Sequence, residues 1–161
     1  MPHVRYIDKT REYYRGEGYA EPYHWAHFDD VPFIRPVRPL AECRVGLATT
    51  SEMALIGETG AWDDNPACNV YALPIDTAVE TLYSKKESYD RHATTLDDVD
   101  SYLPLTRLAE GVAAGRIGGL APRFQVLYSQ YSQRKTLTVD APEILRQMRE
   151  DGVDVAVLTA I

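Results

Sequence analysis

Short apolar runs alternate with polar, glycine-containing stretches over the last two thirds of this chain. Runs of four to nine apolar residues bounded by turn residues are typical of buried strands. The runs that predict such strands are 45–50, 69–73, 124–128 and 153–161. The stretch 77–83 fits neither the helical nor the strand period, and 51–66 and 88–102 are predicted to be loops.

Two segments show the period of a helix with one apolar face. In Pro104–Ala114 the apolar side chains form one stripe, Pro104 suits a first turn, and Gly115 follows where helices end. The second helix is predicted over Ala141–Asp151, with Asp140 as its N-cap and Gly152 as its stop.

Strands that alternate with helices predict an α/β fold, with a mostly parallel sheet and crossover helices. The last strand, Val153–Ile161, is strongly apolar, and a central parallel strand normally continues into a covering helix. We therefore expect residues 43–161 to form an α/β domain that a partner subunit, or a second copy of the chain, completes. An ordinary C-terminal strand at the edge of the sheet is the alternative.

Residues 1–42 differ from this domain in composition, because they combine many aromatic residues with four prolines in their second half. The prolines exclude a long helix there, although a short helix around Tyr6–Tyr14 fits the spacing. The sequence predicts an extended N-terminal arm whose rings cover the domain or a second subunit.

Composition narrows the classes of partner and compartment. The 161 residues carry a formal charge of −7, which repels phosphate backbones and disfavours nucleic acid. No apolar run approaches the roughly 20 residues of a membrane span, and the polar N-terminus does not resemble a signal peptide. Cys43 and Cys68 are the only cysteines, which favours a reduced, cytoplasmic protein. The lack of a membrane span predicts a protein without membrane contact.

Hydroxyl side chains follow the first predicted strand at Thr49, Thr50 and Ser51. At the carboxyl end of a parallel strand, hydroxyls and free backbone N–H groups can hold a carboxylate or phosphate, which predicts a substrate-binding site. Strand capping or turn formation is the structural alternative.

A second candidate site lies in the loop that begins at Ser88. Arg91 is suited to bind a substrate carboxylate in a bidentate manner. Tyr89, Asp90 and His92 supply groups that can move a proton. A solvated loop held by salt bridges would use the same residue types.

A metal site is the third candidate, because His24 and His27 are three residues apart and acidic residues follow. Such a pair on a helical turn can bind zinc, completed by His3, Asp30 or water. Aromatic packing of the arm is the alternative.

The two cysteines fit small buried side chains better than a reactive thiolate. No nucleotide-cofactor motif is present, so the metal ion is the only cofactor that the sequence suggests.

Several short motifs in a fixed order resemble a known family. They are VRYID at 4–8, YHWAH at 23–27, DVPF at 30–33, RVGLATT at 44–50, SYDR at 88–91, SYLPL at 101–105, GRIG at 115–118, LAP at 120–122 and GVDVAVLT at 152–159. Together they resemble the selenoprotein B family of glycine/sarcosine/betaine reductases and the related D-proline reductase subunit.

This resemblance implies a subunit of a multi-subunit reductase that cleaves a C–N bond of an amino-acid derivative. Family members use a selenocysteine with neighbouring cysteines, whereas this sequence has neither a selenocysteine nor a Cys-x-x-Cys motif, and it stops before the family's cysteine-containing second half. We therefore expect a reductase-like subunit for a small carboxylate-bearing substrate, with an active site shared with a partner chain. The alternatives are a non-catalytic scaffold or regulatory subunit, and a metal-dependent enzyme that uses His24 and His27.

Overall fold

The computed structural model describes residues 5–21, 27–57, 69–85, 95–128 and 132–160. The chain divides into two compact units, Met1–Phe33 and Ile34–Ile161, which are treated separately below. Within the described ranges, none of the helices has the length and apolar character needed to cross a membrane.

Among the described residues of the first unit there is one helix, α1 (Tyr6–Gly16), in agreement with the short helix predicted there. Its carboxyl end carries an aromatic cluster in which the rings of Tyr14 and Tyr19 meet edge to face. The extended aromatic arm predicted for residues 1–42 is not confirmed. Residues 34–42 belong to the second unit, where a short 3₁₀ turn, η1 (Leu40–Glu42), leads into the first strand.

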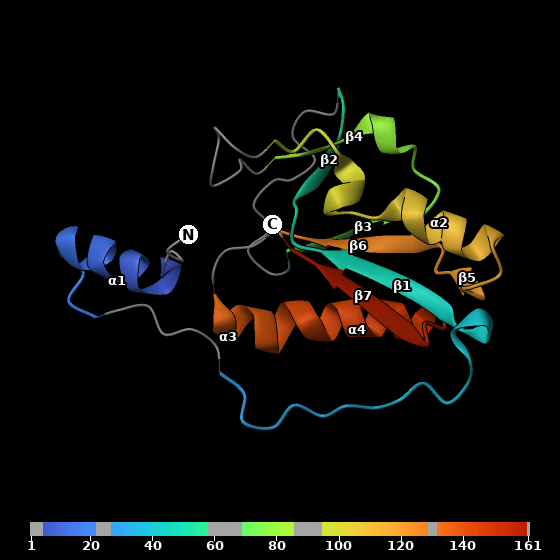
Figure 1. The fold of residues 1–161 in the computed structure, drawn as a ribbon, viewed down its shortest axis with the longest axis horizontal. Helices are drawn as coiled ribbons and strands as arrows, with labels where there is room; N and C mark the ends of the chain where they lie inside the picture. Colours follow the sequence, from blue (N-terminus) through green and yellow to red (C-terminus); the bar gives the residue numbers. More distant parts are fainter. Residues whose placement is uncertain (1–4, 22–26, 58–68, 86–94, 129–131, 161) are drawn as a thin grey trace. The chain divides into compact units, whose positions relative to one another are not determined.

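The second unit is built around a mostly parallel sheet, as predicted (Figure 1). Its central strand β1 (Arg44–Thr49) pairs from Val45 to Thr49 with the whole of β7 (Val155–Thr159). On the other side β1 pairs first with β5 (Gly119–Leu120) and then with β6 (Arg123–Leu127), also in parallel. The edge strand β3 (Val70–Pro74) runs antiparallel to β6.

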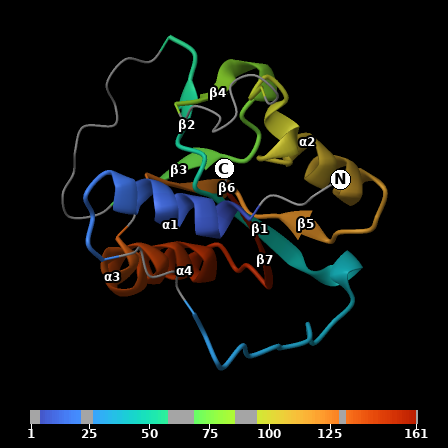
Figure 2. The ribbon, with the colours of Figure 1, turned by 60° about the vertical axis from the view of Figure 1, so that its left-hand side comes forward.

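Helices cover the two faces of this sheet (Figures 1 and 2). One face carries α2 (Leu105–Ala113), and the opposite face carries α4 (Ala141–Glu150). The chain moves from β1 to β6 by way of the first helix, and from β6 back across β1 to β7 by way of the second. The first crossover therefore places β6 on one side of β1, and the second places β7 on its other side. The strand order reverses at β1, which makes the boundary between β1 and β7 a topological switch point.

The main apolar core lies on the α2 face of the sheet. Leu47, Phe124 and Val126 are fully buried there. On the opposite face Gly46 lies against α4 and the segment that follows it. A Cβ on Gly46 would come within 2.9 Å of a Val153 methyl group, so only glycine permits this close packing.

The shortest elements were not predicted. These are strand β5 and the antiparallel pair β2 (Met53–Leu55) and β4 (Leu82–Ser84), together with the 3₁₀ turns η2 (Val79–Thr81) and η3 (Val99–Ser101). Two or three residues are too few to show a period in the sequence. The antiparallel direction of β3 was not apparent either, because an apolar run predicts a strand but not the direction in which it pairs.

The prediction of Asp140 as a helix N-cap is wrong. Asp140 is itself helical, and the helix starts earlier, with α3 (Gln133–Lys135) and a π-helical turn, η4 (Thr136–Asp140). Pro142 has no N–H, and its ring would collide with the carbonyl four residues earlier in a regular helix. The wider π turn immediately before Pro142 lets the helix run through this position.

Candidate functional site

Four hydroxyl residues meet where β1 and β7 end, and we call Thr49, Thr50, Ser51 and Thr159 the strand-end site. Thr49 lies opposite Thr159 in the register of the two strands. The Thr50 N–H donates a hydrogen bond to the Thr159 carbonyl at 3.2 Å. The site therefore occupies the topological switch point, where open α/β sheets place their ligands.

Two of these hydroxyls are buried and bind one another. The side chains of Thr49 and Ser51 form a hydrogen bond, and the Ser51 N–H donates to Thr49 Oγ1 at 3.1 Å. Ser84, at the end of β4, donates its hydroxyl to the Ser51 carbonyl at 2.6 Å. These bonds fix the turn that leaves β1, whereas the Thr50 side chain is half-buried.

Thr159 was not singled out from the sequence, although it ends a predicted parallel strand as Thr49 does. Its Oγ1 is buried and has no hydrogen-bond partner among the described residues. A buried hydroxyl without a partner costs about 1–3 kcal/mol. An oxygen-bearing ligand at the strand end would supply the missing hydrogen bond.

Backbone strain lies directly beside these hydroxyls. Glu52 has a φ of 50°, which is in the left-handed region that residues with a side chain rarely adopt. Such a conformation costs about 1–3 kcal/mol and is found most often at functional sites. The turn after β1 is therefore held in an unfavourable backbone conformation by its neighbours.

The second predicted site, with Tyr89, Asp90, Arg91 and His92, lies outside the described residues. Its segment follows Lys85, whose N–H donates to the Glu52 carbonyl at 3.2 Å. The chain thus enters this segment from a residue bound to the turn of the strand-end site. The roles assigned to these four residues stay predictions.

The predicted metal site is described only in part. His27 is exposed and pairs with Asp29 at 3.1 Å, while His24 lies outside the described residues. Among the residues that the structure describes, no three His, Cys, Asp or Glu side chains are grouped to hold a metal ion. Cys43 is buried and lies 3.6 Å from the Arg38 carbonyl, and Cys68 is not described.

The amino end of the sheet carries charges in place of hydroxyls. Asp154 accepts hydrogen bonds from the Arg38 guanidinium at 2.5 Å and from the Arg44 N–H at 2.8 Å. The bond from the Arg44 backbone, followed by that from Arg38, lowers the pKa of Asp154. These residues line an open pocket of about 380 Å³, together with Glu42, Cys43, Gly118, Gly119, Leu120 and Gly152.

A two-pronged ion pair secures the end of α4 to the same region. The Arg123 guanidinium contacts Asp151 through two hydrogen bonds, of 2.8 and 3.2 Å, and Glu150 at 3.3 Å. Each charge at this end that we have described therefore has an opposite charge or a backbone group beside it.

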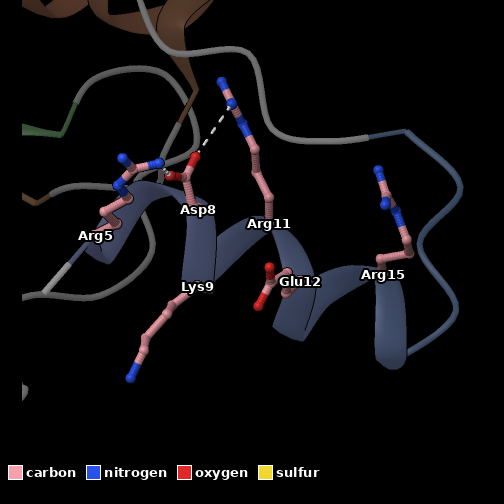
Figure 3. A pocket seen from close by; sticks show the side chains of 6 residues that line it. All are labelled: Arg5, Asp8, Lys9, Arg11, Glu12 and Arg15. Atoms are coloured by element: carbon pink, nitrogen blue, oxygen red, sulfur yellow. Dashed lines mark ion pairs between the residues drawn. The ribbon is translucent and has the colours of Figure 1, made fainter.

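A concave surface of about 460 Å³ in the first unit is lined only by side chains of α1 and of the residue before it (Figure 3). Asp8 lies between Arg5 and Arg11, at 3.8 and 3.9 Å. Because these side chains are exposed and extend from a single helix, the concavity lacks the enclosing walls of a ligand site.

A further group of polar side chains is buried near α4. Both amide atoms of Gln125 lack a hydrogen-bond partner among the described residues, as do Gln147 Oε1 and Asn69 Nδ2. Gln125 lies between Phe124 and Val126 in a strand whose other buried residues are apolar, and this interruption of the pattern was its only signal in the sequence.

Comparison of the chain with models of known families, with curated proteins and with solved structures finds no match.

Proposed function

We propose that this chain is a subunit of a reductase-like enzyme that acts on a small carboxylate-bearing or amino-acid-derived substrate. Its binding site is the strand-end site, and a partner chain shares the active site. One observation carries the location of the site: at the topological switch point, the buried Thr159 hydroxyl lies beside Thr49 without a hydrogen-bond partner. The substrate class is supported by the resemblance to the selenoprotein B family.

The strand-end residues divide into two roles in this proposal. Thr50 and Thr159 donate their hydroxyl protons to the substrate carboxylate. Thr49 and Ser51, which already bind each other, hold the turn in place. A hydrogen bond from a hydroxyl to a charged carboxylate contributes about 1.5–3 kcal/mol.

The following loop supplies the remaining groups. Arg91 binds the same carboxylate in a bidentate manner, and His92 or Asp90 delivers the proton that a departing amine needs, with Tyr89 beside them. Reductive cleavage of a C–N bond also consumes two electrons. These come from thiol or selenol groups of the partner chain, because this chain has two cysteines and no Cys-x-x-Cys motif.

The first test is binding of glycine, sarcosine and betaine to the protein purified with its partners, measured by titration calorimetry. We expect Thr50→Val to weaken binding at least tenfold, because one hydrogen bond to the carboxylate is lost. Thr77→Val is the matched control, since Thr77 is a half-buried threonine near the other end of the sheet. Equal affinities for the two variants, or no binding by the parent protein, would favour a non-catalytic scaffold or regulatory subunit.

A further inference from the structure

Strand β7 has one free edge. It pairs with β1, and no other strand among the described residues lies on its opposite side. Its sequence, VAVLT, contains no proline or charged residue. Proteins normally protect a free edge with such residues or with a bulge, because unpaired backbone groups recruit a further strand. The composition of β7 is therefore that of a paired strand.

Exposed apolar side chains lie both on β7 and on the helix beside the sheet, and we call them the apolar stripe. Leu158 pairs in register with Ala48, so its side chain lies on the same face of the sheet as α4, yet it is 75% exposed. On that helix Leu137, Ala141 and Leu145 are spaced four residues apart, and all three are exposed. The helix therefore leaves the β7 side of this face uncovered.

We propose that a second copy of this chain covers the stripe, with β7 pairing antiparallel to its own copy across a two-fold axis near Val157. A two-fold axis sets each apolar stripe against the identical stripe of the other copy. The segment before η1 adds Ile34, which is 84% exposed, and Val37, which is 99% exposed. The carboxyl-terminal end of this segment lies beside the start of β7, because Arg38 is bonded to Asp154.

The exposed apolar side chains supply the larger part of such an interface. The five large side chains are Ile34, Val37, Leu137, Leu145 and Leu158. At about 100 Å² each they supply roughly 500 Å² per copy before the strand backbones are counted. A stable interface of ordinary size buries about 800 Å² per partner. The backbone edge of β7 and the polar groups beside it therefore have to supply the remaining area, roughly 300 Å² per copy.

Antiparallel pairing has a consequence for the strand-end site, and this step rests on the proposed function. It sets the amino end of one β7 beside the carboxyl end of the other, so Val155 of the second copy lies opposite Thr159. The Arg38–Asp154 pair of that copy then lies beside the strand-end site. Arg38 retains further N–H donors after binding Asp154, and it supplies a positive charge for the substrate carboxylate.

The interface is tested without any ligand, by light scattering and mild oxidation of the full chain. We expect a dimer, and we expect the double variant Ala156→Cys/Leu158→Cys to form a disulfide-linked dimer, because these positions face each other across the axis. Ala156→Lys/Leu158→Lys sets like charges opposite one another and should give a monomer. Ile56→Lys, at an equally exposed position away from β7, should remain a dimer.

A monomeric parent chain would overturn the proposal, as would a dimer that the two lysines leave intact or a β7 edge occupied by a different polypeptide. The shared site is tested with two variants, Arg38→Ala and Thr50→Val. Each variant alone should lose glycine binding, and mixing the two chains should restore part of it. Random mixing of an isologous dimer restores about one quarter of the sites. A dimer that binds none of the three compounds refutes the proposed function alone, whereas binding by a monomer refutes the interface alone.

Discussion

The two ends of the parallel sheet differ in how their polar groups are satisfied. At the amino end Asp154 and Asp151 are each bound to an arginine, at 2.5 and 2.8 Å, and Asp154 also accepts a backbone hydrogen bond. At the carboxyl end the Thr159 hydroxyl is buried without a partner in the described part of the chain. There, Glu52 also adopts a left-handed backbone conformation.

This difference separates stability from function. The Arg123–Asp151 ion pair at the amino end secures the end of α4, and its removal should affect folding only. The carboxyl end carries two features that each cost about 1–3 kcal/mol, and a protein retains such features where it binds something. Substitutions at the two ends should therefore change stability in opposite directions.

The largest expected effect is at the amino end, for Asp151→Asn. This substitution removes the charge that Arg123 contacts through two hydrogen bonds. The free energy of unfolding, measured by denaturant titration, should fall by about 1–2 kcal/mol, because Arg123 is partly exposed to solvent. Glu150→Gln is the matched control. Glu150 is exposed and contacts Arg123 at 3.3 Å and Arg146 one turn earlier, so the substitution should cost less than about 0.5 kcal/mol. Equal losses of unfolding free energy in the two variants would contradict a special contribution of the Arg123–Asp151 ion pair.

At the carboxyl end, Thr159→Val should change the free energy of unfolding in the opposite direction. The methyl group replaces a buried hydroxyl without a described partner, so the free energy of unfolding should rise by about 1 kcal/mol. Binding of the carboxylate probes should weaken at the same time. Thr77→Val is the control, since it removes a bond of 2.7 Å to the Pro74 carbonyl and should lower stability. A loss of stability in Thr159→Val would mean that its hydroxyl already has a partner.

The smallest expected effect is on the pH dependence of the free energy of unfolding. The pKa of Asp154 is lower in the folded protein than in the unfolded chain, so the unfolded chain binds a proton first as the pH falls. The resulting stabilisation is complete above the ordinary aspartate pKa of about 3.9, and it is lost as the pH falls through the lower folded value. Glu143, whose pKa is lowered to about 2 by hydrogen bonds from Arg146 and then Gln147, contributes with the same sign.

Denaturant titrations between about pH 5 and pH 2 measure this effect. In Asp154→Asn the loss of stability on acidification should be smaller than in the parent chain. In Thr159→Val it should be unchanged, because a threonine does not titrate. An identical acid profile in the parent and Asp154→Asn would exclude a role for the Asp154 pair.

The longer elements of the second unit could be predicted because each carries a periodic signal of its own. The apolar runs gave β1, β6 and β7, and the stripe in 104–114 gave α2. The start of the last helix was missed. Its extra turns carry polar and apolar residues without a clear period, and Pro142 imitates a first turn.

The candidate site was predicted only in part. Thr49, Thr50 and Ser51 were singled out because they lie at the end of a buried strand, and that strand end lies at the switch point of the sheet. Thr159 required the knowledge that its strand lies next to β1, since strand order is not encoded in the local pattern. The lack of a partner for its hydroxyl, and for Gln125, depends on what surrounds each side chain in space.

The sequence by itself determined which segments form the long strands and helices, and which residues end the first strand. It could do so because periodicity and turn residues act over a few neighbouring positions. Only the tertiary structure decided that β3 runs antiparallel, that β1 lies between β6 and β7, and that Thr159 meets Thr49. These features arise from contacts between residues far apart in the chain, whose energies depend on packing and hydrogen-bond satisfaction in three dimensions.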